Sequence, residues 1–228
     1  MNMKFLATSA VAAVMLSAPA FAATVVIDDF STDQIAVDTP AFGVGSPSTT
    51  FGGTFIGTSR TFEVTNTQRT GDAGFETVLQ ANSGILSFNN ASGAQGTATL
   101  TYEGLFDLMN TVDNGYFFFD VLAFDSIANF MLSGEDADGN LLSYDELLDG
   151  DFSPILRFSE ITGSDVFDFS RVASLSFSIS SSGLIDSTDG RLDSIEVSAV
   201  PVPAAGLLLL GAMGGLAGLR RRKAKQAA

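Results

Sequence analysis

The sequence predicts an all-β protein whose central domain is an antiparallel β-sandwich of the jelly-roll type, flanked by an apolar helix at each end. Three observations predict this fold. Apolar and polar residues alternate with a period of two through much of residues 23–199, as in strands with one face in a core and the other in water. Clusters of Gly, Asn, Asp and Ser separate about ten such segments. No part of this region has an apolar stripe of helical period over three turns.

The first 22 residues have the features of a secretory signal peptide, in the usual order. A lone positive charge, Lys4, precedes a long apolar stretch, and small residues follow at Ala20 and Ala22. Signal peptidases accept small side chains at these two positions, so we expect cleavage after Ala22, with Ala23 as the first mature residue. Signal peptidase is therefore a predicted partner, and the protein is expected to be exported across the inner membrane.

Residues 23–199 form the predicted sandwich domain. The alternation is clearest in TFEVTN (61–66), TATLTY (97–102), SLSFSIS (174–180) and DSIEVSA (193–199). The segment YFFFDVLAF, at 116–124, is almost wholly apolar, so we expect a central strand buried on both faces. The segment SYDELLDG, at 143–150, is a candidate for a short helical turn. Residues 39–58 are rich in Gly, Ser and Thr and are expected to form a long loop.

Composition excludes several classes of chemistry. The chain has no Cys and no His, which excludes disulfides, a Ser-His-Asp triad, a Cys nucleophile and the usual zinc sites. Residues 23–199 hold all 26 acidic residues against five Arg and no Lys, a formal charge of −21. Such a domain repels nucleic acid and favours cations, Ca²⁺ among them. The alternative explanation of this charge is solubility, because a high net charge by itself keeps an exported protein dispersed.

One acidic segment has the spacing of a calcium loop. In SGEDADGNLLSYDE (133–146), a calcium site would use Asp136, Asp138, Asn140 and Asp145. The first ligand position of such a loop falls on Gly134, which has no side-chain ligand. A β-hairpin with an acidic turn explains the same residues, so we predict a hairpin and leave open whether it holds a structural calcium.

Two further groups of residues are candidates for a site. The first and last strands of sandwiches are often neighbours, which would bring Asp28, Asp29 and Asp193 to one edge, either as a cluster or as an acidic edge that resists aggregation. Sugars stack on aromatic rings, and Tyr144, beside the acidic hairpin, is the tyrosine that we expect to be available. Tyr102 and Tyr116 lie in strand patterns.

The chain ends with an apolar run and a block of positive charge. Residues 204–219 are apolar and would span about 24 Å as a helix, short of a ~30 Å hydrocarbon core. The basic residues that follow are Arg220, Arg221, Arg222 and Lys223, at the start of a basic tail over 220–228. By the positive-inside rule they stay in the cytoplasm and the acidic domain faces outward. The inner membrane is thus a predicted partner through this helix.

These last residues, 200–228, resemble the VPLPA variant of the PEP-CTERM sorting signal of exported Gram-negative bacterial proteins. The motif positions are Val200, Pro201, Val202, Pro203, Ala204 and Ala205, with Val202 where the family usually has Leu. The resemblance implies recognition by an exosortase-type membrane transpeptidase, a transient membrane anchor, and then the cell surface or the extracellular biofilm matrix. The alternative is an ordinary single-pass anchor.

The body of the chain is similar to galactose-binding-like and carbohydrate-binding-module-like jelly rolls. The similarity lies in VIDDFS (26–31) and in the segment from FDFSRVASLSFSIS to DGRLDSIEV, residues 167–197. We therefore expect a surface-sorted, non-enzymatic protein of the matrix or envelope that binds an extracellular polysaccharide. The alternatives are a structural or adhesive protein without a small ligand, and a glycoside hydrolase that uses paired carboxylates.

Overall fold

The structure is a computed structural model of the 228-residue chain. It describes residues 24–38, 45, 47–66, 76–91, 94–108, 115–125, 127–149, 155–181 and 188–199. The signal peptide with its cleavage site, the sorting motif, the apolar run and the basic tail lie outside these residues, so their predictions stay predictions. Within the described ranges, no helix is long and apolar enough to cross a membrane.

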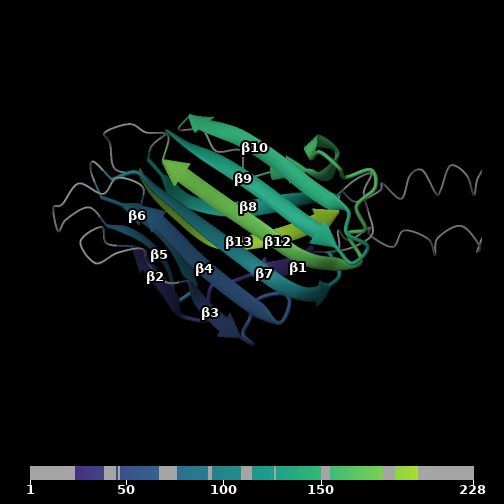
Figure 1. The fold of residues 1–228 in the computed structure, drawn as a ribbon, viewed down its shortest axis with the longest axis horizontal. Coiled ribbons are helices and arrows are strands. Elements are labelled where there is room, and N and C mark those ends of the chain that lie inside the picture. Colours follow the sequence, from purple (N-terminus) through teal and green to yellow (C-terminus); the bar gives the residue numbers. More distant parts are fainter. Residues whose placement is uncertain are drawn as a thin grey trace, which may run out of the picture. The chain divides into compact units, whose positions relative to one another are not determined.

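The described part of the chain folds into two antiparallel sheets (Figure 1). The seven-stranded sheet has, in spatial order, β11 (Ile155–Arg157), β8 (Gly115–Phe124), β13 (Thr188–Ala199), β6 (Ile85–Asn90), β5 (Thr77–Asn82) and β2 (Gln34–Asp38), and β1 (Thr24–Asp28) pairs with β13. The six-stranded sheet has β10 (Leu141–Asp149), β9 (Ile127–Asp136), β12 (Val172–Ser181), β7 (Gly96–Phe106), β4 (Ser59–Asn66) and β3 (Ser48–Phe51). A short 3₁₀ helix, η2 (Phe158–Glu160), follows β11.

The predicted antiparallel β-sandwich is confirmed. The chain crosses between the sheets in several successive connections, from β7 to β8, from β8 to β9 and from β12 to β13. The predicted pairing of the first and last strands is also confirmed, since Val25 of β1 lies opposite Val197 of β13. The predicted hairpin is formed by β9 and β10.

The core lies between the sheets and is rich in phenylalanine. Phe177 of β12 meets Phe117 and Phe119 of β8 edge to face, with ring centroids 5.9 Å and 5.7 Å apart. These contacts join one sheet to the other, and each buried Phe contributes about 1.5–3 kcal/mol of hydrophobic stabilisation. A chain without disulfides is therefore held together by its aromatic core.

Three local predictions were wrong. The strand β8 is buried on one face only, because a two-layer sandwich leaves the outer face of each sheet to water: Phe117 is fully buried, whereas Leu122 is 52% exposed. Residues 143–149 continue the edge strand β10 and do not form a helical turn. The predicted loop over residues 39–58 contains the strand β3.

The outer face of the six-stranded sheet carries a continuous row of hydroxyl groups. The strand registers place one hydroxyl residue of each strand side by side, in the order Ser143, Ser133, Ser176, Thr101, Thr61 and Thr49. Two neighbouring pairs are hydrogen-bonded through their hydroxyl oxygens, which are 3.0 Å apart in Thr101–Ser176 and in Thr49–Thr61. The row itself is uncharged, and the same face also carries exposed acidic residues, among them Glu63 and Asp145.

Candidate functional site

The residues predicted to bind calcium do not converge on one point. Asp136 ends β9, and its carboxylate accepts hydrogen bonds from the backbone of Asp138 (2.9 Å), Asn140 (2.8 Å) and Asp168 (2.9 Å). The side-chain amide of Asn140 donates a further bond of 2.8 Å. These bonds, that from Asp168 first, lower the pKa of Asp136 to about 2. The carboxylate is thus used to close the hairpin turn.

The other predicted ligands are directed elsewhere. The Asp138 carboxylate lies 3.1 Å from the guanidinium of Arg171. Asp145 lies well along β10, opposite Met131, and is exposed. Within the described ranges, no three acidic residues are grouped so that they could hold a metal ion. The donor set therefore does not fit the predicted calcium.

The three aspartates expected at the β1–β13 edge have separate environments. Asp29 is exposed and accepts a hydrogen bond of 2.5 Å from Thr54, and Asp193 is exposed on β13. Asp28 is fully buried, and its Oδ2 atom lies 2.8 Å from Nη1 of Arg60. The prediction of an exposed acidic edge was therefore wrong for Asp28, because an arginine from the other sheet neutralises it.

Arg60 is enclosed on all sides. Its Nε donates to Gln34 Oε1 at 2.8 Å, and its guanidinium lies 5.0 Å and 4.8 Å from the ring centroids of Phe55 and Phe62. The Tyr102 hydroxyl donates to Asp28 Oδ2 at 2.7 Å. Burial, followed by the charge of Asp28, raises the pKa of Tyr102 well above its usual value. This cluster joins the sheets, because Asp28 and Arg60 lie in different ones. Its fully buried side chains are closed to a ligand.

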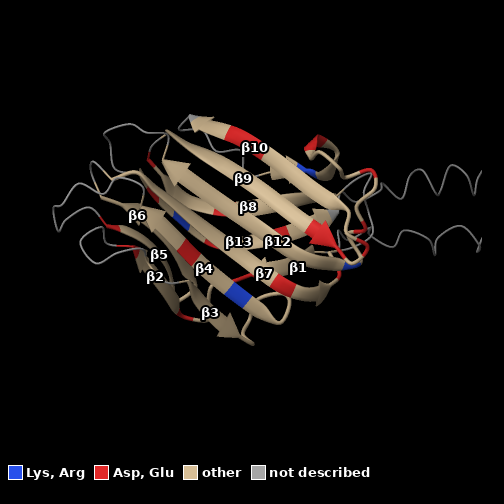
Figure 2. Ribbon diagram, in the orientation of Figure 1, with Lys and Arg blue, Asp and Glu red and all other residues tan. Residues whose placement is uncertain are grey.

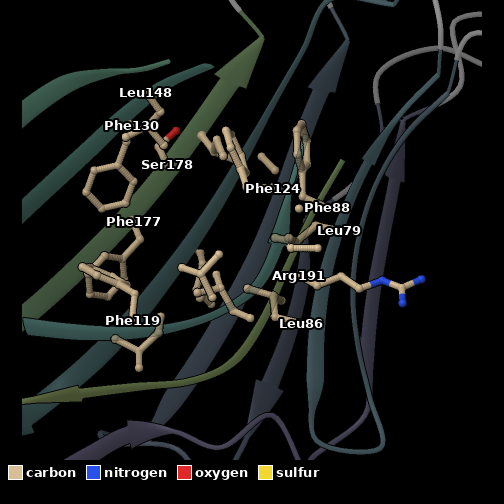
Figure 3. A pocket seen from close by; sticks show the side chains of 18 residues that line it. Leu79, Leu86, Phe88, Phe119, Phe124, Phe130, Leu148, Phe177, Ser178 and Arg191 are labelled. Atoms are coloured by element: carbon tan, nitrogen blue, oxygen red, sulfur yellow. The ribbon is translucent and has the colours of Figure 1, made fainter. Parts of the chain in front are cut away.

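A small apolar cavity lies between the sheets (Figure 3). It has a volume of about 80 Å³, and its lining includes Leu86, Phe88, Phe124 and Phe177. Arg191 also lines it, but the guanidinium points away from the apolar side chains in Figure 3. The cavity offers few polar groups to orient a ligand, and binding sites generally need several.

A larger cleft, of about 430 Å³, lies where the outer strands of the two sheets meet, and we call it the edge cleft. β10 and β9 supply Tyr144, Glu146 and Phe130 from the six-stranded sheet; β8, β11 and η2 supply Phe119, Ile155, Leu156, Arg157 and Glu160 from the other side. Its volume lies within the usual range of small-molecule sites. Apolar rings and charged groups both face it, which distinguishes it from the apolar cavity.

The aromatic part of the edge cleft begins in the core. The ring of Phe119 meets that of Phe130 edge to face at 5.4 Å, and the Phe130 ring lies 6.5 Å from that of Tyr144. Phe119 and Phe130 are buried, whereas Tyr144 is partly exposed. A tyrosine ring held by the core is thus presented to the cleft at a fixed angle.

The hydroxyl of Tyr144 donates a 2.7 Å hydrogen bond to Glu146 Oε2. Alternate residues of a strand point to the same face, so these two side chains project together from β10. Partial burial, then the bond to Glu146 and the charges of Glu146, Glu160 and Asp145, raises the pKa of Tyr144 to about 12. The phenol therefore stays protonated, and negative charge surrounds it.

The opposite wall carries one ion pair. Nε of Arg157 lies 3.9 Å from Glu160 Oε1, and the backbone N–H of Arg157 donates to Glu160 Oε2 at 3.2 Å. Both side chains are more than half exposed, at 57% and 52%. The carboxylate of Glu160 thus turns back over the start of η2 and leaves both charged groups open to the cleft.

This wall is fixed to both sheets. Phe158 of η2 is fully buried, and its ring centroid lies 5.1 Å from that of Phe117 in β8 of the seven-stranded sheet. Beyond η2, Ser143 and Thr162 exchange two backbone hydrogen bonds of 3.0 Å, which ties this segment to β10. The two walls of the edge cleft therefore have a defined separation.

Sequence reasoning identified one residue of the edge cleft. Tyr144 was predicted to be the available tyrosine, and it is the tyrosine that lines the cleft. Arg157 and Glu160 were missed, because they meet β10 only through the tertiary fold. Figure 2 shows acidic residues on β10. Glu146 falls at a position of this edge strand that the alternation assigns to the inner face, and an acidic residue there was the sequence signal that could have indicated the cleft.

No protein-family model matches the chain, and no curated protein matches it. Among solved structures, it is similar to the family 30 carbohydrate-binding module of a Clostridium thermocellum cellulosomal cellulase, with 15% identity and a TM-score of 0.40 over 78% of this chain and 98% of that one. The family 11 module of another cellulase of that organism gives 14% identity and a TM-score of 0.36, over 78% of this chain and 95% of that one. An agarase gives 14% identity and a TM-score of 0.40 over 62% of this chain, which spans 23% of the agarase. At these TM-scores the likeness carries no argument about what this chain binds.

Proposed function

We propose that this protein is an exported, surface-sorted glycan-binding protein of the extracellular matrix or envelope. The observation that carries the proposal is the edge cleft, in which a core-anchored tyrosine ring faces two carboxylates and a guanidinium. The sequence features at the two ends of the chain support the export and sorting parts of the proposal.

The groups in the edge cleft match the chemistry of a sugar ring. One face of a pyranose presents C–H groups that pack on an aromatic ring, and its hydroxyls both donate and accept hydrogen bonds. Glu146 and Glu160 accept hydrogen bonds, and Arg157 donates them. Because these groups are carried by an anchored strand and turn, the backbone needs little ordering on binding, and the cost falls on the exposed side chains.

Binding suits this site better than hydrolysis. A glycosidase keeps one carboxyl group protonated as a general acid, usually by burying it in an apolar pocket. Glu160 is 52% exposed and engages Arg157, and the exposed Glu146 accepts the Tyr144 hydrogen bond. Neither carboxylate has the environment that a general acid requires, so we assign both to ligand binding.

A glycan array followed by calorimetry on the purified full-length protein tests the binding. We expect Tyr144→Ala to weaken the binding of the selected glycan by about tenfold through loss of the stacking surface. Phe51→Ala is the matched control, because Phe51 is an aromatic residue that is 80% exposed at the opposite edge of the six-stranded sheet. Equal binding by the wild type and Tyr144→Ala, or binding of no glycan, would refute the proposal.

Intact mass tests the export and sorting parts separately. Protein recovered from the cell surface and the medium should begin at Ala23 and end within residues 200–205. A mass that includes residues 206–228 would leave a membrane-anchored protein and would refute sorting by a transpeptidase, while leaving glycan binding untouched.

A further inference from the structure

The charges that face the edge cleft do not balance. Two carboxylates, Glu146 and Glu160, face one guanidinium, Arg157, and that guanidinium is already paired with Glu160. A third carboxylate, Asp145, is close enough to raise the pKa of Tyr144. The site therefore has an excess of negative charge beside its aromatic ring.

The carboxylate of Glu146 can accept a further hydrogen bond from a ligand. Its Oε2 atom accepts the Tyr144 hydroxyl, and no group among the described residues donates to its Oε1 atom. The residue lies on an exposed part of an edge strand, so a ligand can approach it. An ammonium group, with three donors and a positive charge, complements such an oxygen better than a neutral hydroxyl does.

The rest of the domain adds to the same field. Residues 23–199 carry five Arg against 26 acidic residues. Two of these arginines are already neutralised, since Arg60 is buried against Asp28 and Arg171 pairs with Asp138. A surface of this sign repels uronic or sulfated polysaccharides and raises the local concentration of cationic ones.

We propose that the edge cleft binds an amino sugar with a free amine, within a cationic polysaccharide. The sugar ring packs on Tyr144 and the ammonium group is held by Glu146 and Glu160. This inference rests on the proposed glycan binding and specifies its ligand class.

The test compares three tetrasaccharides of the same β-1,4 linkage by calorimetry: tetraglucosamine, its N-acetylated counterpart and cellotetraose. The full-length protein is used at a pH at which the amines are protonated. We expect tetraglucosamine to bind about tenfold more tightly than the other two, because only it forms charge-assisted hydrogen bonds with the carboxylates. We also expect Glu146→Gln to remove this preference, with Glu160→Gln as an independent second variant and circular dichroism as the check of folding.

Glu63→Gln is the matched control, because it removes one charge from an exposed position on the outer face of β4. It should leave the preference unchanged. The inference would be overturned if Glu63→Gln and Glu146→Gln lost the preference for tetraglucosamine equally. It would also be overturned if tetralysine bound as tightly as tetraglucosamine, because charge alone would then explain the binding. Equal binding of the three tetrasaccharides would also overturn it and leave the proposed glycan binding standing, whereas failure of every glycan to bind would overturn both.

Discussion

Asp28, in the first strand of one sheet, and Arg60, in the other sheet, form a fully buried ion pair with Oδ2 and Nη1 2.8 Å apart. Tyr102 donates to the same carboxylate oxygen, and the backbone N–H of Phe30 donates to the other oxygen at 2.8 Å. The pair thus has the additional hydrogen bonds that a buried pair needs if it is to offset the cost of desolvation.

We expect Arg60→Met to lower the free energy of unfolding by about 3–5 kcal/mol, because it leaves the buried charge of Asp28 without its partner. The double variant Asp28→Asn/Arg60→Met should lose less than the sum of the two single changes. Arg171→Met is the control: its partner Asp138 lies at a similar distance, 3.1 Å, but both side chains are at least half exposed, so the loss should be below about 1 kcal/mol. Urea unfolding of the wild type and of these four variants, Asp28→Asn included, measures the losses. Similar losses for Arg60→Met and Arg171→Met would contradict this account.

The hairpin turn gives a prediction for pH. Asp136 has a folded-state pKa of about 2, below its ordinary value of 3.8, so its stabilising contribution is present above about pH 4 and is lost as the pH falls towards 2. Asp136→Asn should destabilise the protein near neutral pH and reduce the loss of stability between about pH 4 and pH 2. Asp145→Asn removes an exposed carboxylate from the same hairpin and should keep the wild-type curve. Thermal unfolding across this range measures the difference, which would be absent if the carboxylate of Asp136 did not hold the turn.

Two glycines with the same backbone conformation should respond differently to a methyl group. Gly139 and Gly163 have φ angles of +84° and +86°, which disfavour any L side chain. A Cβ at Gly139 meets open space, whereas at Gly163 it overlaps the carbonyl oxygen of Leu141. Gly139→Ala should cost about 1–2 kcal/mol, and Gly163→Ala clearly more, because the segment beside the edge cleft has to move. Equal melting temperatures for the two variants would show that this close approach is absent in solution.

Tyr144→Phe separates stacking from hydrogen bonding in the edge cleft. The ring is kept, but the donor to Glu146 is lost, so glycan affinity should fall by less than in Tyr144→Ala.

Partial burial and the nearby carboxylates raise the pKa of Tyr144 to about 12, above the ordinary value of 10, so the phenol favours folding fully below pH 10 and loses that effect as the pH rises towards 12. Wild-type unfolding free energy should therefore fall more steeply over this range than that of Tyr144→Phe, and parallel curves would argue against the raised pKa.

Much of the fold could be predicted because the period of two shows which face of each strand is buried. In SLSFSIS, the residues Leu175 and Phe177 are buried and the serines face outward, as the pattern predicts. The pattern does not contain the register between strands, so the alignment of six hydroxyl residues in one row could not be predicted. The hairpin was predicted, but its second strand was expected to give way to a helical turn from residue 143. Glu146 interrupts the alternation of Leu142, Tyr144 and Leu148, and the segment is rich in good helix formers.

Less of the candidate site could be predicted, because it is assembled by tertiary contacts. The period-two pattern places Tyr144 and Glu146 on one face of a strand, but it does not show that η2 lies across from them. The Asp28–Arg60 pair was hidden for the same reason, since 32 positions separate the two residues in sequence. With 26 acidic residues in the chain, no local rule selects those that are buried, Asp28 among them.

The pairing of β1 with β13 has a mechanical consequence. Thr24 lies opposite Ser198, so a tension applied to the chain outside these two residues would peel β1 away one hydrogen bond at a time, starting at Thr24. The five-residue strand β1 pairs with β13 alone among the described strands, so we expect it to detach first when the chain is pulled. The peeling ends at Asp28, where the carboxylate is fastened to Arg60 of the opposite sheet. We therefore expect the buried ion pair to resist further separation of β1 from the domain when the chain is stretched.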